Sequence, residues 1–181
     1  MMRVSVVGNS GSGKTTLGRA LAARLGVPHV ELDGIYHQAD WQPLPTEEFR
    51  ALVDAATAAG GWVVDGNYSA VRDLVWARAD TVVVLDPPRR TVMRQVILRT
   101  LRRVALRVEL WNGNREQWRN LFARDPQESV VVWAWRRHSV YRERYLAMAA
   151  DPMWRHLTFV RIRSRADARR LLDAGNAAAG L

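Results

Sequence analysis

The chain has 181 residues, a length that suits one domain with a substantial core, and it contains no cysteine. The missing thiols exclude a disulfide framework and thiolate metal sites, and they fit a reducing cytoplasm, where we expect the protein to act. The net charge is +9, with 7 basic and 9 acidic side chains in residues 1–85 against 20 and 9 in residues 86–181, which indicates an arginine-rich surface or an anionic partner.

Strand and helix patterns alternate along the chain. Residues 4–7 form a β-branched run typical of a buried strand, and apolar side chains from Leu17 to Leu25 recur at helical spacing until Gly26. Residues 34–45 are predicted to be irregular. Further strands are predicted over 29–33, 62–65, 81–85 and 158–162, and further helices from Thr46 to just before Gly60 and over 71–77, 91–108, 128–149 and 165–174.

This alternation predicts an α/β fold whose parallel sheet is covered on both faces. We find no internal repeat and no linker, so we expect a single domain over residues 1–181. No apolar run approaches the roughly 20 residues that cross a membrane. Because the first residues lead directly into a strand, we also expect no signal peptide.

One motif carries the strongest functional signal. Residues 8–15 read Gly-Asn-Ser-Gly-Ser-Gly-Lys-Thr and match the phosphate-binding pattern G-x-x-x-x-G-K-[ST] between a predicted strand and a predicted helix. Backbone N–H groups and the positive helix end are expected to surround the phosphates of a nucleoside triphosphate, which we take to be ATP with Mg²⁺. The residues expected to bind it are Gly8, Ser10, Gly11, Ser12, Gly13, Lys14, Thr15 and Thr16.

The lysine of this motif has a specific chemical role. Lys14 is the one lysine among 27 basic side chains, and the other 26 are arginines. A compact ammonium on a flexible stem reaches between the β- and γ-phosphates, where a planar guanidinium fits poorly. We therefore predict Lys14 to be catalytic as well as nucleotide-binding.

Two carboxylates at predicted strand ends are candidates for the metal. The hydroxyl of Thr15 and the carboxylate of Asp65 are the predicted Mg²⁺ ligands, since Asp65 ends a strand and Gly66 allows a tight turn after it. Asp86 is the alternative, although an Asp before two prolines commonly caps a turn.

Other side chains are candidates for the acceptor and for the transferring group. Asp33 ends the predicted second strand and could orient or deprotonate an acceptor hydroxyl, or it could simply form a turn before Gly34. His37 and Trp41 follow it and could touch substrate or serve as ordinary surface and packing residues. Five arginines could neutralise phosphoryl charge, of which we expect two or three to face the nucleotide: Arg94, Arg99, Arg102, Arg103 and Arg115.

Several segments together resemble the adenylate kinase-like P-loop kinases, and among them the proteins labelled DNA topology modulation proteins. Besides the loop, the resemblance covers Leu32-Asp33-Gly34 with Tyr36-His37 and Trp41, Val64-Asp65-Gly66-Asn67-Tyr68 with Arg72-Asp73, Leu85-Asp86, and Leu110-Trp111-Asn112-Gly113-Asn114-Arg115-Glu116. It implies a nucleoside monophosphate kinase-like fold with a five-stranded parallel core, a mobile lid at about residues 105–127, and phosphoryl transfer from ATP.

The chain departs from true adenylate kinases in the acceptor segment. Those enzymes place an Arg after the second strand, whereas this chain has Asp33 and Asp40 there and no Arg between Arg24 and Arg50. Arg72 matches the Arg that follows the Asp-Gly pair in that family and is therefore a candidate for substrate binding. With a carboxylate at position 33, the chain is similar to the small-molecule kinases that phosphorylate hydroxyls, such as shikimate or gluconate kinase.

The leading hypothesis is an ATP-dependent kinase of a small molecule or nucleotide, with Lys14, Asp33, Arg94, Arg99 and Arg115 as catalytic residues. One alternative is a nucleic-acid-associated regulator controlled by its nucleotide state, which the basic half of the chain favours weakly. Another is an ATPase without an acceptor.

Overall fold

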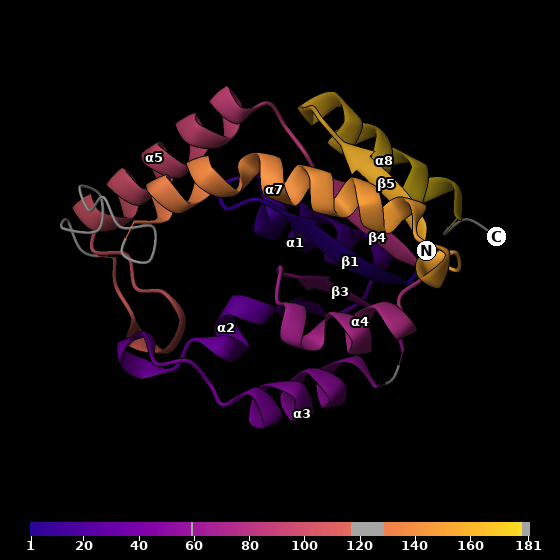
Figure 1. Ribbon diagram of the computed structural model, residues 1–181, viewed down its shortest axis with the longest axis horizontal. Coiled ribbons are helices and arrows are strands. Elements are labelled where there is room, and N and C mark those ends of the chain that lie inside the picture. Colours follow the sequence, from indigo (N-terminus) through magenta and orange to yellow (C-terminus); the bar gives the residue numbers. More distant parts are fainter. Residues whose placement is uncertain (59, 117–128, 179–181) are drawn as a thin grey trace.

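The fold is built on five parallel strands. The computed structural model describes residues 1–58, 60–116 and 129–178. Its strands form one sheet in the order β2-β3-β1-β4-β5, with every neighbouring pair parallel and β1 in the centre (Figure 1). The predicted α/β class with a five-stranded parallel sheet is confirmed. The strands are β1 (Arg3–Gly8), β2 (His29–Glu31), β3 (Trp62–Asp65), β4 (Thr81–Leu85) and β5 (Thr158–Ile162).

Helices flank the sheet and connect its strands. In Figure 1, α5 and α7 run side by side, and Val92, Val96 and Ala134 form the buried contact between them. Within the described ranges, no helix combines the length and the apolar character needed to cross a membrane. The helices are α1 (Lys14–Leu25), α2 (Leu32–Tyr36), α3 (Thr46–Thr57), α4 (Arg72–Arg78), α5 (Arg89–Ala105), α7 (Val130–Ala150) and α8 (Arg165–Ala178).

Side chains of the central strand β1 point alternately into two cores, one on each face of the sheet. Val4 and Val6 of β1 pack in one core with Leu21 of α1 and with side chains of α8. Val7 packs in the other core, which α3, α4 and α7 cover with large side chains such as Trp76. Because all strands are parallel, the segments that follow them emerge at the same edge of the sheet, where ligands bind in such folds.

Two differences from the predicted boundaries bear on the candidate site. The predicted strand 29–33 ends at Glu31, because Leu32 begins the one-turn helix α2 and buries its side chain. Asp33 therefore lies in a helical turn rather than at a strand end. The predicted helix 91–108 ends at Ala105, because Arg107 takes a left-handed φ of 45° that stops the helix.

The connection after α5 folds back toward the segment after β2. Glu109 and Arg115 pair in an isolated antiparallel bridge, and the 3-10 turn η3 (Trp111–Gly113) lies between them. This turn contacts α2 and the 3-10 turn η1 (Ala39–Trp41). The predicted lid over 105–127 is described as far as residue 116, and residues 117–128 lie outside the described residues. The lid's mobility and the single domain over 1–181 stay predictions.

Candidate nucleotide and acceptor site

The predicted phosphate loop joins the central strand to α1. It begins at Gly8, where β1 ends, and reaches Lys14, where α1 begins. Gly8, Gly11 and Gly13 have φ angles of 149°, 76° and 100°, in the region that side chains disfavour. A Cβ on Gly8 would lie 2.6 Å from the carbonyl oxygen of Leu85. The loop geometry therefore requires these glycines, and it opens onto the first N–H groups of α1, which have no partner within the helix.

Two asparagines hold the loop in this shape. The amide of Asn67, after β3, accepts from the backbone N–H of Gly8 at 3.0 Å and donates to the carbonyl of Gly8 at 2.5 Å. Asn9 accepts from the N–H of Ser10 at 2.9 Å and donates to the carbonyl of Ala134 in α7 at 2.6 Å. The loop is thus fixed before any phosphate arrives, which lowers the entropy cost of binding.

Lys14 lies inside the loop with its ammonium directed at backbone oxygen. Its Nζ donates to the carbonyl of Asn9 at 3.2 Å. Burial lowers the pKa of the Lys14 ammonium, an effect that the nearby carboxylates of Asp33, Asp65 and Glu31 oppose. An anionic triphosphate at this position would add further compensation for the buried charge.

Thr15 and two strand-end carboxylates form an oxygen-rich corner beside the loop. Thr15 donates its hydroxyl proton to Oε1 of Glu31 at 3.1 Å, which leaves the oxygen lone pairs of Thr15 available to a cation. Glu31 and Asp65 are paired neighbours across β2 and β3. A hydroxyl and two carboxylates are the hard ligands that Mg²⁺ prefers, so these residues fit the predicted metal.

Asp65 is buried and held by a histidine. Its Oδ2 lies 2.9 Å from Nε2 of His29, on the adjacent strand β2. The ring of His29 packs so close to Gly18 of α1 that a Cβ there would lie 2.8 Å from Nε2. This contact fixes one oxygen of the Asp65 carboxylate.

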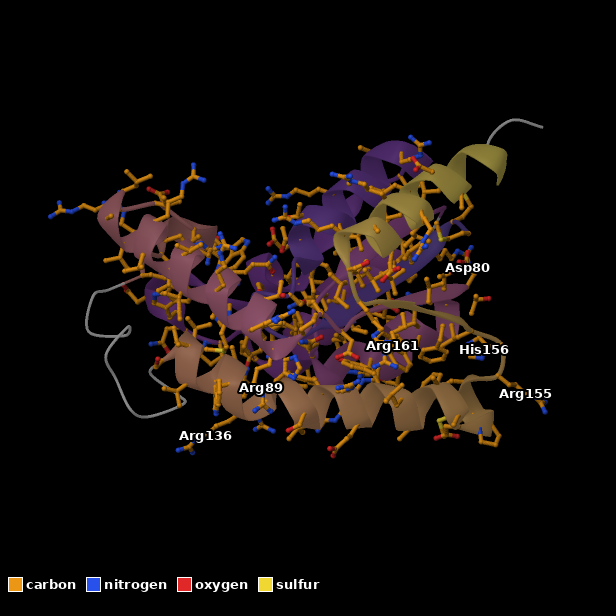
Figure 2. All side chains as sticks on the ribbon, turned by 90° about the horizontal axis from the view of Figure 1, so that it is seen from above. Asp80, Arg89, Arg136, Arg155, His156 and Arg161 are labelled. Atoms are coloured by element: carbon orange, nitrogen blue, oxygen red, sulfur yellow. The ribbon has the colours of Figure 1, made fainter. Side chains whose placement is uncertain are left out.

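The alternative metal candidate, Asp86, has a different environment. Its carboxylate accepts from Nε of Arg161 at 2.9 Å, and Nε of Arg142 lies 3.3 Å away. Arg161, labelled in Figure 2, projects from β5, and Arg142 belongs to α7. Two guanidinium groups neutralise this carboxylate, which indicates a structural ion pair.

One predicted arginine reaches the phosphate loop. Arg99 of α5 lies 3.3 Å from the hydroxyl of Ser10 through Nη2, and its Nε is buried without a hydrogen-bond partner among the described residues. Burial, reinforced by the neighbouring Arg103, lowers the pKa of the Arg99 guanidinium. A buried cation without a bonded carboxylate is poised to bind an anion.

The other candidate arginines lie elsewhere. Arg94 is exposed on α5, and Arg115 is exposed and pairs with Glu109 at 3.4 Å. Arg103 pairs with Glu116 at 2.8 Å. The structure thus brings Arg99 to the loop and leaves Arg94 and Arg115 at the surface.

The predicted acceptor residues gather around Asp33. Tyr68, after β3, donates its hydroxyl to Oδ1 of Asp33 at 2.7 Å, and Nε2 of His37 lies 3.3 Å from the same hydroxyl. Burial lowers the pKa of His37, although Asp33 opposes this effect, so the ring is neutral near pH 7. Trp41 is partly exposed, with its ring edge against His37 at 5.4 Å between centroids.

Arg72 approaches this region from α4. Its guanidinium lies 5.8 Å from the ring centre of Trp76, and its Nη2 is buried without a partner among the described residues. Arg72 lines a small pocket together with Asn67, Tyr68 and Tyr145. Arg72 therefore lies near Tyr68, on the acceptor side of the sheet edge.

The connection after α5 closes over the acceptor segment. Asn114 accepts from the N–H of Trp41 at 2.9 Å and donates to the carbonyl of Gln38 at 2.8 Å. Trp111 lies so close to Gly34 that a Cβ there would be 2.8 Å from Cδ1 of the indole. Asparagine side chains thus tie two segments together that are more than 70 residues apart in sequence.

Comparisons with known proteins agree with this architecture. A family model described as "ATPase family associated with various cellular activities (AAA)" matches residues 4–76, which run from β1 into α4. Shikimate kinase from Acinetobacter baumannii in complex with shikimate is similar in structure, with 19% identity, a TM-score of 0.55, and coverage of 96% of this chain and 90% of that chain.

Shikimate kinase from Bacteroides thetaiotaomicron is similar over 99% of both chains, with 16% identity and a TM-score of 0.51. The chain has the fold of a P-loop NTPase. The two solved structures named here are kinases, but identities this low establish the fold and leave the activity to be argued from the site. None of the curated proteins matches the chain in sequence. The narrower resemblance to DNA topology modulation proteins stays a hypothesis.

Sequence reasoning missed four side chains of this candidate site. Glu31 lies within the predicted second strand, but we assigned the functional carboxylate of that strand to Asp33. His29 lies in the same predicted strand and has no metal-ligand spacing that would single it out. Asn67 and Tyr68 directly follow Asp65 at the carboxyl edge of the sheet, and this placement is the signal that could have identified them.

Proposed function

We propose that the protein is an ATP-dependent kinase that transfers the γ-phosphoryl group to a hydroxyl of a small molecule. The observation that carries this proposal is the environment of Asp33. Asp33 lies close enough to Lys14 and Arg99 to influence the pKa of both cations, yet its hydrogen bond comes from the neutral phenol of Tyr68. A carboxylate next to the phosphate loop, without a bonded cation, suits an acceptor hydroxyl.

Separate groups of residues are proposed to bind the phosphates and the metal. Lys14 and the loop amides hold the β- and γ-phosphates, and Arg99 adds positive charge beside Ser10. Thr15, Glu31 and Asp65 would hold Mg²⁺, directly or through its waters. Bound Mg²⁺ neutralises charge on the β- and γ-phosphates and on the leaving group.

Asp33 acts on the acceptor. Its carboxylate accepts the proton of the acceptor hydroxyl as the oxygen of that hydroxyl bonds to the γ-phosphorus. The bond from the γ-phosphorus to the β,γ-bridging oxygen breaks, and ADP leaves with the bonding electrons. The folded-back segment at Trp111 and Asn114 covers the acceptor side and excludes water, which otherwise competes as acceptor.

Charge in the acceptor segment favours a neutral hydroxyl over a nucleoside monophosphate. Among the described contacts, Asp33 has no bonded arginine, and Asp40 lies on the same segment. A monophosphate brings about two negative charges and normally binds to arginine in bidentate geometry. Arg72, with its unpartnered Nη2, is the one residue of the predicted acceptor set that could bind an anionic group of the acceptor.

A transfer screen with labelled ATP tests the proposal. Nucleoside monophosphates, nucleosides, sugars and hydroxy acids, shikimate included, are offered as acceptors to wild type and to Asp33→Asn. We expect a hydroxyl compound to accept label, with kcat falling strongly in Asp33→Asn and ATP affinity unchanged. Robust phosphorylation of AMP, undiminished in Asp33→Asn, would contradict the hydroxyl assignment.

The nucleic-acid alternative has less support. The arginines labelled in Figure 2 come from separate segments: Arg89 from α5, Arg136 from α7, Arg155 from the stretch after α7 and Arg161 from β5. DNA-binding surfaces usually gather basic side chains on one face or one helix. Filter binding over a salt series separates the two hypotheses, because a DNA regulator would bind with a steep salt dependence.

A further inference from the structure

Tyr68 is held rigidly beside the candidate acceptor site. It follows β3 and packs its ring against Tyr36, with centroids 4.6 Å apart, and edge-on against Phe49 at 5.2 Å. Phe49 is fully buried in the core under α3. Because two aromatic neighbours fix the ring, its hydroxyl has a defined position.

The hydroxyl of Tyr68 takes part in a chain of hydrogen bonds with one possible direction. A carboxylate only accepts, so the single phenolic proton goes to Oδ1 of Asp33 at 2.7 Å. The contact of 3.3 Å between Tyr68 and Nε2 of His37 then requires the imidazole to donate. The chain runs from His37 through Tyr68 to Asp33, and every proton in it points toward the carboxylate.

We infer that Tyr68 is a positioning residue that fixes Oδ1 of Asp33 and reserves Oδ2 for the acceptor hydroxyl, an inference that rests on the proposed kinase function. Without this bond the carboxylate could rotate about χ2 and present either oxygen, or turn toward Lys14 or Arg99, the two cations that influence it electrostatically. Among the described residues, Oδ2 of Asp33 makes no hydrogen bond. Tyr68 acts through Asp33 and not on the substrate.

A neutral phenol suits this task better than a cation would. A guanidinium or ammonium bonded to Asp33 would withdraw charge from the oxygen that has to accept a proton. Burial, reinforced by Asp33, raises the pKa of Tyr68, so the phenol keeps its proton over the working pH range. Orientation is thus obtained without neutralising the carboxylate.

A double-mutant cycle on MgATP hydrolysis tests the inference, with water taking the place of the acceptor hydroxyl. Tyr68→Phe removes one oxygen and keeps the ring. We expect kcat to fall by about tenfold, as loss of a hydrogen bond to a charged group predicts, while the affinity for a fluorescent ADP analogue stays unchanged. In an Asp33→Asn background, Tyr68→Phe should cause no further loss, because the residue acts through Asp33.

Tyr36→Phe is the matched control, since Tyr36 packs in the same aromatic cluster and donates no hydrogen bond to Asp33. It should retain wild-type kcat, and thermal unfolding should show that both variants are folded. Tyrosine labelled with ¹³C at Cζ gives a second readout by NMR. The chemical shift of the Tyr68 signal should change in Asp33→Asn, because a neutral amide replaces the charged acceptor of its hydroxyl proton.

Several results would overturn the inference. In the kinetics, these are a wild-type kcat in Tyr68→Phe when Asp33→Asn is impaired, additive losses in the double mutant, or an equal loss in Tyr36→Phe. In the NMR experiment, it is a Tyr68 signal at the same chemical shift in wild type and in Asp33→Asn. A wild-type protein that neither binds nor hydrolyses MgATP would instead remove the proposed function itself, and the inference with it.

Discussion

Replacing Asn67 with alanine should loosen the phosphate loop. The Asn67 amide makes two hydrogen bonds to the backbone of Gly8, and its Oδ1 also accepts from the hydroxyl of Tyr145 at 3.0 Å. Tyr145 is almost fully buried, so its hydroxyl would lose its acceptor without gaining water. At about 1 kcal/mol for each of the lost bonds, Asn67→Ala should cost about 3 kcal/mol of unfolding free energy.

This loss converts into measurable shifts. For a chain of this size, each kcal/mol lowers Tm by about 2–4 °C, so Tm should fall by about 6–12 °C. Ligand binding then has to order the loop at a cost in entropy. ADP affinity measured by calorimetry should therefore drop by about tenfold, which corresponds to about 1.4 kcal/mol.

Asn114→Ala is the matched control for Asn67→Ala. Asn114 is buried and, like Asn67, makes side-chain hydrogen bonds, here to Trp41, Gln38 and Trp111, but it lies in the segment that covers the acceptor side. Its variant should lose comparable stability and keep wild-type ADP affinity. The reasoning is refuted if Asn67→Ala matches wild type in both measurements, or if Asn114→Ala weakens ADP binding equally.

Three further predictions concern the charges of the site. Burial lowers the pKa of Lys14, so the charged form of this side chain is disfavoured in the folded protein at pH 7. Lys14→Met should therefore raise the Tm of the ligand-free protein while abolishing ADP binding. An unchanged or lower Tm would contradict the expected stabilisation. His29→Ala frees Asp65, so the gain in ADP affinity on adding Mg²⁺ should shrink while Mg²⁺-free affinity stays the same; an unchanged metal titration would show that Asp65 needs no such support. Arg99→Ala should lower kcat by on the order of 10³, and Arg94→Ala by less than twofold, since Arg99 alone of the two reaches the loop; equal effects in steady-state kinetics would argue against this distinction.

The order of the elements and the phosphate-loop motif were accessible from the sequence, because both depend on local patterns. The β-branched runs of β1 and β4 and the apolar periodicity of α1 are complete within short windows. The phosphate loop is a contiguous motif whose glycines have a direct steric reason. These features need no knowledge of distant contacts.

The supporting side chains could not be derived in the same way. Tyr68 meets Asp33 across 35 residues, and His29 meets Asp65 across 36, after the strands have paired. The end of β2 was misplaced because Leu32 and Asp33 continue a strand-like sequence, whereas burial of Leu32 in the core favours a helical turn. Packing between distant segments decided these positions, and periodicity does not report on it.

The most direct test of the kinase assignment is a single-turnover reaction with γ-labelled ATP, Mg²⁺ and the acceptor selected by the transfer screen. The assignment predicts that the label appears in a phosphate ester of that acceptor faster than in inorganic phosphate. It also predicts that Asp33→Asn suppresses ester formation without weakening ATP binding. Label that appears only as inorganic phosphate, at a rate that no hydroxyl compound changes, would contradict the assignment and identify an ATPase.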